Sequence, residues 1–108
     1  MNDAAGSPEA QVGSLDAGVE TWRLRGDLTV FNVEAIYRAS RAAPLPQTGA
    51  VDCFEVNHAD SAALALLLEI KRRATSEGRP LAFRGLSPAV LNLAGVYGIA
   101  ALLGEPAS

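Results

Sequence analysis

The chain has 108 residues, 49% of them hydrophobic, and its nine basic and twelve acidic side chains give a formal net charge of −3. This length predicts one domain, and the apolar content excludes disorder over most of the chain. The chain has no excess of basic side chains, which argues against nucleic-acid binding. No apolar run reaches the roughly eighteen residues that a membrane-spanning helix needs.

The single cysteine and the single histidine limit the chemistry that this chain can carry. Cys53 has no partner for an internal disulfide, and His58 alone supplies neither a paired-histidine zinc site nor a catalytic triad. The glycines are scattered and none opens a phosphate-binding loop. We therefore expect a cytoplasmic, non-enzymatic domain without a metal ion or another cofactor and without direct membrane insertion.

The N-terminal segment differs in composition from the rest of the chain. Residues 1–10 combine Gly, Ser, Pro and acidic side chains without hydrophobic periodicity. This pattern predicts a disordered acidic tail. The folded domain is then expected to span residues 11–104.

The hydrophobic pattern of the domain predicts alternating strands and helices. In chain order these are strands over 11–15 and 19–25, a helix over 31–42, a strand over 50–56, a helix over 61–77, a strand over 80–84 and a helix from 87 to about 98. The first two strands are expected to flank a hairpin turn at Asp16-Ala17-Gly18. Gly26-Asp27 should end the second strand, and residues 57–60 should form a short turn. Trp22 and Leu24 share one strand face, which should meet the core.

The element order β-β-α-β-α-β-α predicts the fold class. A hairpin followed by alternating helices and strands favours an α/β domain with a mixed sheet of four to five strands. The helices are expected to pack mainly on one face of that sheet. Ile99, Leu102 and Leu103 form a last apolar cluster after the final helix.

The helix expected over 61–77 has the strongest signal in the chain. Either Asp60 or Ser61 is suited to cap its N-terminus, and Gly78 follows its last residue. At about 100° per residue, the stripe facing the sheet should contain Leu64, Leu67, Ile70 and Ala74. The opposite face should present Ala62, Ala65, Glu69, Arg72, Arg73 and Ser76, with Leu66 on one flank and Leu68 on the other.

The stretch from Val51 to Leu67 resembles the strand-turn-helix core of STAS domains, the fold of anti-sigma-factor antagonists. In that family an aspartate-bearing strand is followed by an Asp-Ser or Asp-Thr pair that opens a leucine-rich helix. Asp52 and Asp60-Ser61 match this pattern. Leu24-Arg25-Gly26-Asp27-Leu28 is similar to the family's turn after the second strand. The resemblance covers about residues 15–103 and rests on the ordered set of motifs.

The C-terminal stretch of the chain indicates which type of STAS protein it resembles. Residues 93–99, Leu-Ala-Gly-Val-Tyr-Gly-Ile, are similar to the ending of MlaB-type proteins, which are small accessory subunits of a bacterial ABC transporter that maintains outer-membrane lipid asymmetry. This resemblance implies a regulatory partner of the transporter's ATPase subunit, held at the inner membrane through that partner. An anti-sigma-factor antagonist, bound by its kinase, is the alternative. A small-ligand or nucleotide-binding domain is a third hypothesis, against which the missing phosphate loop counts.

Ser61 is the candidate switch residue in either regulatory reading. A helix cap needs only one side chain, so if Asp60 caps the helix, the Ser61 hydroxyl is left for a partner or for phosphorylation. The small side chains that follow would allow close docking of another protein. The predicted partner-binding residues are Asn57, His58, Asp60, Ser61, Ala62, Ala65, Leu66, Glu69, Arg72 and Arg73.

Deleting residues 1–10 should leave folding unchanged, because this segment offers no apolar periodicity to the core. Thermal melting of the full chain and of the truncated chain measures this. A decrease in melting temperature beyond about 4–8 °C, equivalent to about 1 kcal/mol in a domain of this size, would show instead that the segment packs.

Overall fold

The computed structural model describes residues 13–103, so the predicted tail over residues 1–10 lies outside the described residues. Four strands and four helices form the described part of the chain. They are β1 (Ser14–Ala17), β2 (Thr21–Leu28), α2 (Val33–Arg41), β3 (Ala50–Ala59), α3 (Ser61–Ser76), β4 (Ala82–Arg84), α4 (Pro88–Val96) and α5 (Ala100–Leu103).

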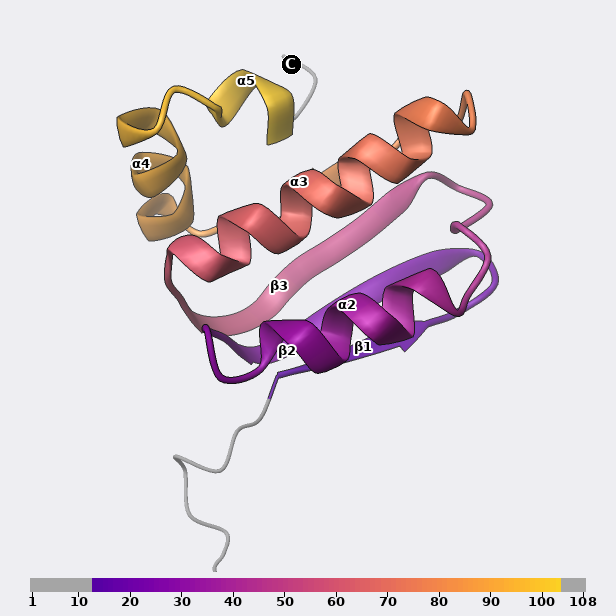
Figure 1. The fold of residues 1–108 in the computed structure, drawn as a ribbon, viewed down its shortest axis with the longest axis horizontal. Coiled ribbons are helices and arrows are strands. Elements are labelled where there is room, and N and C mark those ends of the chain that lie inside the picture. The colour runs from indigo at the N-terminus through magenta and orange to yellow at the C-terminus, as the bar shows by residue number, and fades with distance from the viewer. Residues whose placement is uncertain (1–12, 104–108) are drawn as a thin grey trace, which may run out of the picture.

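The strands form one mixed sheet in the order β1-β2-β3-β4. β1 runs antiparallel to β2, whereas β2, β3 and β4 are parallel to one another. Figure 1 shows α2 and α3 lying across the same side of the sheet, with α4 and α5 beside α3. The predicted α/β class, with a mixed sheet and helices on one face, is therefore confirmed, with four strands in the described residues.

The core lies between the sheet and α3. Trp22, Val51 and Phe83 pair across β2, β3 and β4, and none of the three side chains is exposed to solvent. The predicted apolar stripe of α3 covers them, since Leu64, Leu67, Ile70 and Ala74 are all buried. The helical spacing of these residues therefore predicted the buried face correctly.

The end of β2 corrects the sequence interpretation. The strand continues through Gly26-Asp27 to Leu28 and pairs with a β3 that extends to Ala59. Gly26 has a φ of 78° beside a register shift, a conformation that glycine adopts without steric cost. Residues 57–59 consequently lie in a strand and not in the predicted turn, because parallel pairing with β2 continues past the irregularity.

Other element boundaries differ by a few residues from the prediction. β1 includes Asp16 and Ala17, which were expected in the turn. α2 begins at Val33 instead of residue 31, because a turn precedes it in which the Thr29 carbonyl oxygen accepts hydrogen bonds from the Asn32 and Val33 amides. β4 is confined to residues 82–84, and the C-terminal apolar cluster contains the short helix α5.

Shortening a side chain of the core-facing stripe of α3 should lower the stability of the domain. Leu67→Ala is expected to lower the free energy of unfolding by about 2–5 kcal/mol, because Leu67 is 1% exposed and its loss leaves a cavity. Chemical denaturation followed by circular dichroism measures the change. The control is Val96→Ala, a truncation at a side chain that is 81% exposed, which should change stability by less than about 0.5 kcal/mol. Equal losses in the two variants would contradict the assignment of α3 to the core.

Candidate functional site at the N-terminus of helix α3

The loops that precede α2 and α3 lie at one edge of the sheet. β2 and β3 are parallel, so both strands end at this edge, where Leu28 pairs with Ala59. The Asp60 amide donates a hydrogen bond of 3.3 Å to the Leu28 carbonyl oxygen and extends the pairing by one residue. The carboxyl ends of parallel strands are where α/β folds place their functional loops.

Asp60 joins these two loops through its carboxylate. Oδ1 accepts a hydrogen bond of 2.9 Å from the Ala62 amide and so caps α3. Oδ2 accepts a second hydrogen bond of 3.1 Å from the Val30 amide in the loop before α2. Of the two cap residues that the sequence allowed, the structure therefore selects Asp60.

Ser61 is left outside this network. Its residue is exposed at the first position of α3, and its hydroxyl forms no hydrogen bond with any residue from 13 to 103. The amides at this end of a helix favour negative charge, so a phosphate on Ser61 is compatible with the helix dipole. The Ser61 hydroxyl is thus available to another molecule.

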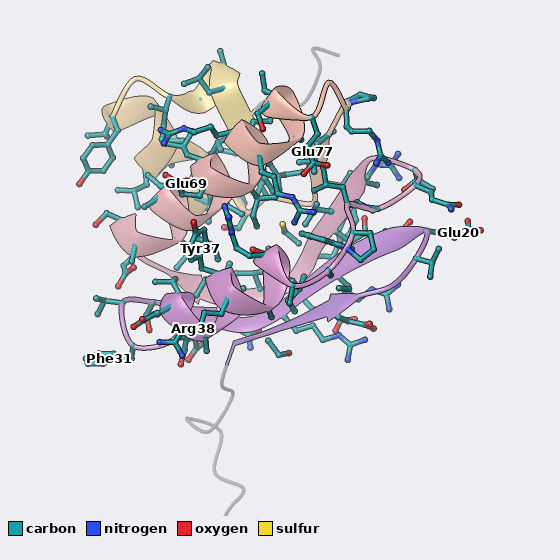
Figure 2. All side chains as sticks on the ribbon, turned by 45° about the vertical axis from the view of Figure 1, so that its right-hand side comes forward. Glu20, Phe31, Tyr37, Arg38, Glu69 and Glu77 are labelled. Carbon is teal, nitrogen blue, oxygen red and sulfur yellow. The ribbon has the colours of Figure 1, made fainter. Side chains whose placement is uncertain are left out.

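A groove between α2 and α3 opens beside Ser61. Its volume is about 430 Å³, and its wall is mostly apolar. The lining residues are Val33, Glu34, Tyr37, Ala62, Ala65, Leu66 and Glu69. Figure 2 shows Tyr37 on α2 directed toward α3, with Glu69 on the facing helix.

The two acidic residues of the groove are each paired on their own helix. Glu34 forms an ion pair of 2.8 Å with Arg38, and Glu69 forms one of 3.1 Å with Arg72. The groove consequently offers apolar surface between two neutralised carboxylates. This arrangement favours an apolar side chain from a partner over a charged one.

Two large apolar side chains stand exposed in the loop that leads into the α2 wall of the groove. Phe31 is 92% exposed and Val30 is 63% exposed, both in the loop held by Asp60. Figure 2 shows Phe31 projecting from the start of α2. An exposed aromatic side chain beside an apolar groove is typical of a protein-binding surface.

Comparison with known families identifies this chain. A family model described as "Mlab, STAS domain" matches residues 14–104. The chain belongs to the MlaB-type STAS family. A search of curated proteins gave no match.

Within this STAS domain, five of the predicted partner-binding residues adjoin the groove or its N-terminal rim. Ser61 and Ala65 are exposed, whereas Ala62 and Glu69 are half-buried. Leu66 lines the groove floor, but it is only 3% exposed and packs into the core. The prediction that Leu66 lies at the flank of the exposed face is therefore wrong, because its side chain is buried in the core below the groove.

The remaining predicted residues lie around this surface. Asn57 and His58 are exposed near the end of β3, and the Nδ1 atom of His58 lies 3.1 Å from Oδ1 of Asp27. Arg72 is exposed and pairs with Glu69. Asn57 and His58 therefore lie near the C-terminal end of β3, which leads to the site, and Arg72 lies on the outer face of α3.

Arg73 has a structural role that the helical spacing did not reveal. Its guanidinium donates hydrogen bonds of 2.6 Å to the Ser40 carbonyl oxygen and 2.9 Å to the Ala43 carbonyl oxygen, and it also pairs with Glu77 at 2.8 Å. These bonds satisfy carbonyl groups at the C-terminal end of α2. The expectation of an outward-facing Arg73 is therefore wrong, because the long side chain reaches the neighbouring helix.

The sequence interpretation missed the contribution of α2 and its preceding loop. Val33, Glu34 and Tyr37 form the second wall of the groove, and the exposed Val30 and Phe31 lie in the loop before this wall. One signal was present in the sequence. The helix already had its apolar stripe at Val33, Ile36 and Tyr37, so the consecutive Val30-Phe31 pair was surplus to the core.

Cys53 lies apart from this surface in the core. Burial, with a smaller contribution from the Asp52 carboxylate, raises the pKa of Cys53 from 9.0 to about 12. The thiol therefore stays protonated near neutral pH, which makes it a poor nucleophile or metal ligand. Among residues 13–103, no three His, Cys, Asp or Glu side chains are grouped as a metal site would require.

Substitutions of Asp60 and of Ser61, at the start of α3, should differ in their effect on the free energy of unfolding. Asp60→Ala is expected to cost about 1–2 kcal/mol, because the helix loses its cap, while the exposed Val30 amide can turn to water. Asp60→Asn should cost less, since asparagine is also a good cap. Ser61→Ala should change stability by less than about 0.5 kcal/mol. Urea denaturation measures all three, and a Ser61→Ala loss equal to that of Asp60→Ala would refute the assignment of the cap.

Proposed function

We propose that this chain is a non-catalytic STAS subunit that binds and regulates the ATPase subunit of a phospholipid-transporting ABC system. Family membership supports this, since STAS proteins are generally non-catalytic regulators. The observation that carries the proposal is the Ser61 hydroxyl, which is exposed and unbonded within the described residues beside the α2–α3 groove. In this function the domain is cytoplasmic and reaches the inner membrane only through its partner.

The surface has the composition of a protein interface. Phe31 and Val30 supply apolar area, and the groove between α2 and α3 can receive an apolar side chain from the partner. Ala62 and Ala65 allow another backbone to approach α3 closely. No helix within residues 13–103 is long and apolar enough to cross a membrane.

Ser61 would control binding through charge. In the bound state its hydroxyl lies in the contact, where it forms one neutral hydrogen bond. A phosphate there adds a charge of about −1.5 to −2 that the helix dipole tolerates in the free domain. A dry interface does not tolerate this charge unless a cation of the partner faces it. The residue therefore acts as a switch without chemistry in its own chain.

The second candidate function is an anti-sigma-factor antagonist controlled by phosphorylation of Ser61. The same observation favours it, because a kinase needs an accessible serine hydroxyl and Asp60 leaves this one unbonded. The two functions use one surface and differ in the partner. Binding measurements with a purified ABC ATPase subunit and with a purified anti-sigma kinase of the same organism separate them.

Substitutions of Ser61 should alter binding and leave the fold intact. Ser61→Ala is expected to weaken binding to the ATPase subunit by about 0.5–1.5 kcal/mol, the net value of one hydrogen bond. Ser61→Asp should weaken it by about 3 kcal/mol or more, roughly a hundredfold in Kd, because a carboxylate is buried without a partner. Isothermal titration calorimetry gives the affinities, and thermal melting verifies folding.

Ser76→Asp is the matched control. It introduces the same side chain at the opposite end of α3, about 22 Å along the helix axis. Its affinity for the ATPase subunit should equal that of the wild type. The proposal fails if the wild-type domain does not bind the ATPase subunit, or if Ser61→Asp binds it as tightly as the wild type does. Binding to the anti-sigma kinase alone, abolished by Ser61→Asp, would establish the second function.

A further inference from the structure

The face of the sheet opposite the helices carries a row of alternating charges. In the register of the strands, Asp16 of β1 lies opposite Arg23 of β2, and Arg23 lies opposite Asp52 of β3. Asp52 in turn lies opposite Arg84 of β4. Read across the four strands, the row is acid, base, acid, base. Residues paired across neighbouring strands lie on the same face of a sheet, so the four side chains share one face.

This row points away from the core. The neighbouring row along the strands is Trp22, Val51 and Phe83, whose side chains are fully buried under the helices. Successive residues of a strand alternate between faces, so the charged row lies on the other side. Asp16, Arg23 and Arg84 are exposed and Asp52 is half-buried.

The four charged side chains lie opposite one another without forming ion pairs in the described part of the chain. None of them forms an ion pair or a side-chain hydrogen bond there, whereas the adjacent Arg25 forms an ion pair of 3.2 Å with Glu55. In Figure 1 no helix lies over this face of the sheet. Parallel strands are ordinarily covered on both faces, so the open face of β2, β3 and β4 lacks a usual layer.

The order of the charges matches a second copy of the same chain. Consider a twofold axis that runs parallel to the strands between two sheets packed face to face. This axis places β1 opposite β4 of the other copy and β2 opposite β3. Each acid then faces a base: Asp16 faces Arg84, and Arg23 faces Asp52, in both directions across the axis. A twofold axis perpendicular to the strands would instead place each charge opposite itself, which is repulsive.

We propose that the open face of the sheet, centred on Asp16, Arg23, Asp52 and Arg84, is a homodimer interface. The strands have four, eight, ten and three residues. At about 3.3 Å per residue and about 4.8 Å between strands they present roughly 400 Å² per copy, about half of a standard interface. An interface of this size is typical of weak, transient association, so we expect the dimer at high protein concentration only. It uses the side of the sheet opposite to the α2–α3 groove, so it goes beyond the proposed function and is independent of it.

Sedimentation velocity of the full chain from about 5 μM to 1 mM tests the dimer. We expect a concentration-dependent dimer at about 50 mM salt that weakens at about 500 mM salt, where charges are screened over a shorter distance. Arg23→Glu makes two of the four contacts repulsive and should raise the dimer Kd at least tenfold. Arg72→Glu, a charge reversal on the helix side, should leave the Kd unchanged.

A charge-swapped pair tests whether this face of the sheet forms the contact. Arg23→Glu combined with Arg84→Glu makes the whole row acidic, and Asp16→Lys combined with Asp52→Lys makes it basic. Each variant alone should be monomeric, and an equimolar mixture should form a heterodimer. Circular dichroism melting of each variant verifies that it is folded before the mixture is measured.

The proposal is overturned if the wild-type chain stays monomeric at 1 mM in low salt. It is also overturned if folded Arg23→Glu dimerises as the wild type does, or if the two oppositely charged variants do not associate. A dimer that Arg72→Glu disrupts would place the interface on the helices instead. Because none of these measurements uses the ATPase subunit or Ser61, failure of the dimer leaves the proposed function standing, and the reverse also holds.

Discussion

The candidate site depends on the two hydrogen bonds that the carboxylate of Asp60 accepts. One of its oxygens fixes the start of α3, and the other fixes the loop that leads into α2. This single side chain therefore links the start of α3 to the loop that leads into α2, the two segments at the open end of the groove. It also leaves the neighbouring serine hydroxyl without a structural role, because the cap position is already filled.

The sheet separates two surfaces of different chemistry. On the helix side the exposed surface near the strand ends is apolar, with Phe31 and Val30 beside a groove whose acids are neutralised. On the open side it is charged, with alternating Asp and Arg across the strands. An apolar surface suits a lasting contact with a partner, whereas a charged surface of small area suits weak association that responds to salt. The two proposed contacts therefore use opposite faces of the sheet and do not compete for the same surface.

Much of the fold could be predicted from local pattern. The spacing of Leu64, Leu67, Ile70 and Ala74 identified the buried face of α3, and Gly78 marked its end, where it adopts a φ of 67°. The end of β2 could not be predicted in this way. Gly26-Asp27 has the composition of a turn, yet parallel pairing with β3 keeps these residues in the sheet. Pairing between strands distant in sequence overrode the local preference.

By itself the sequence determined the α/β class, the STAS resemblance, the core stripe of α3 and the presence of a free polar side chain beside a cap. These depend on periodicity and on residues near each other in the chain, which a sequence displays directly. Tertiary structure alone decided that Asp60 also holds the loop before α2, that Arg73 bonds to α2, that α2 forms the second wall of the groove, and that four charges from four strands form one row. Each of these depends on contacts across loops or strands, and strand register and helix packing, which set those contacts, have no local signal in the chain.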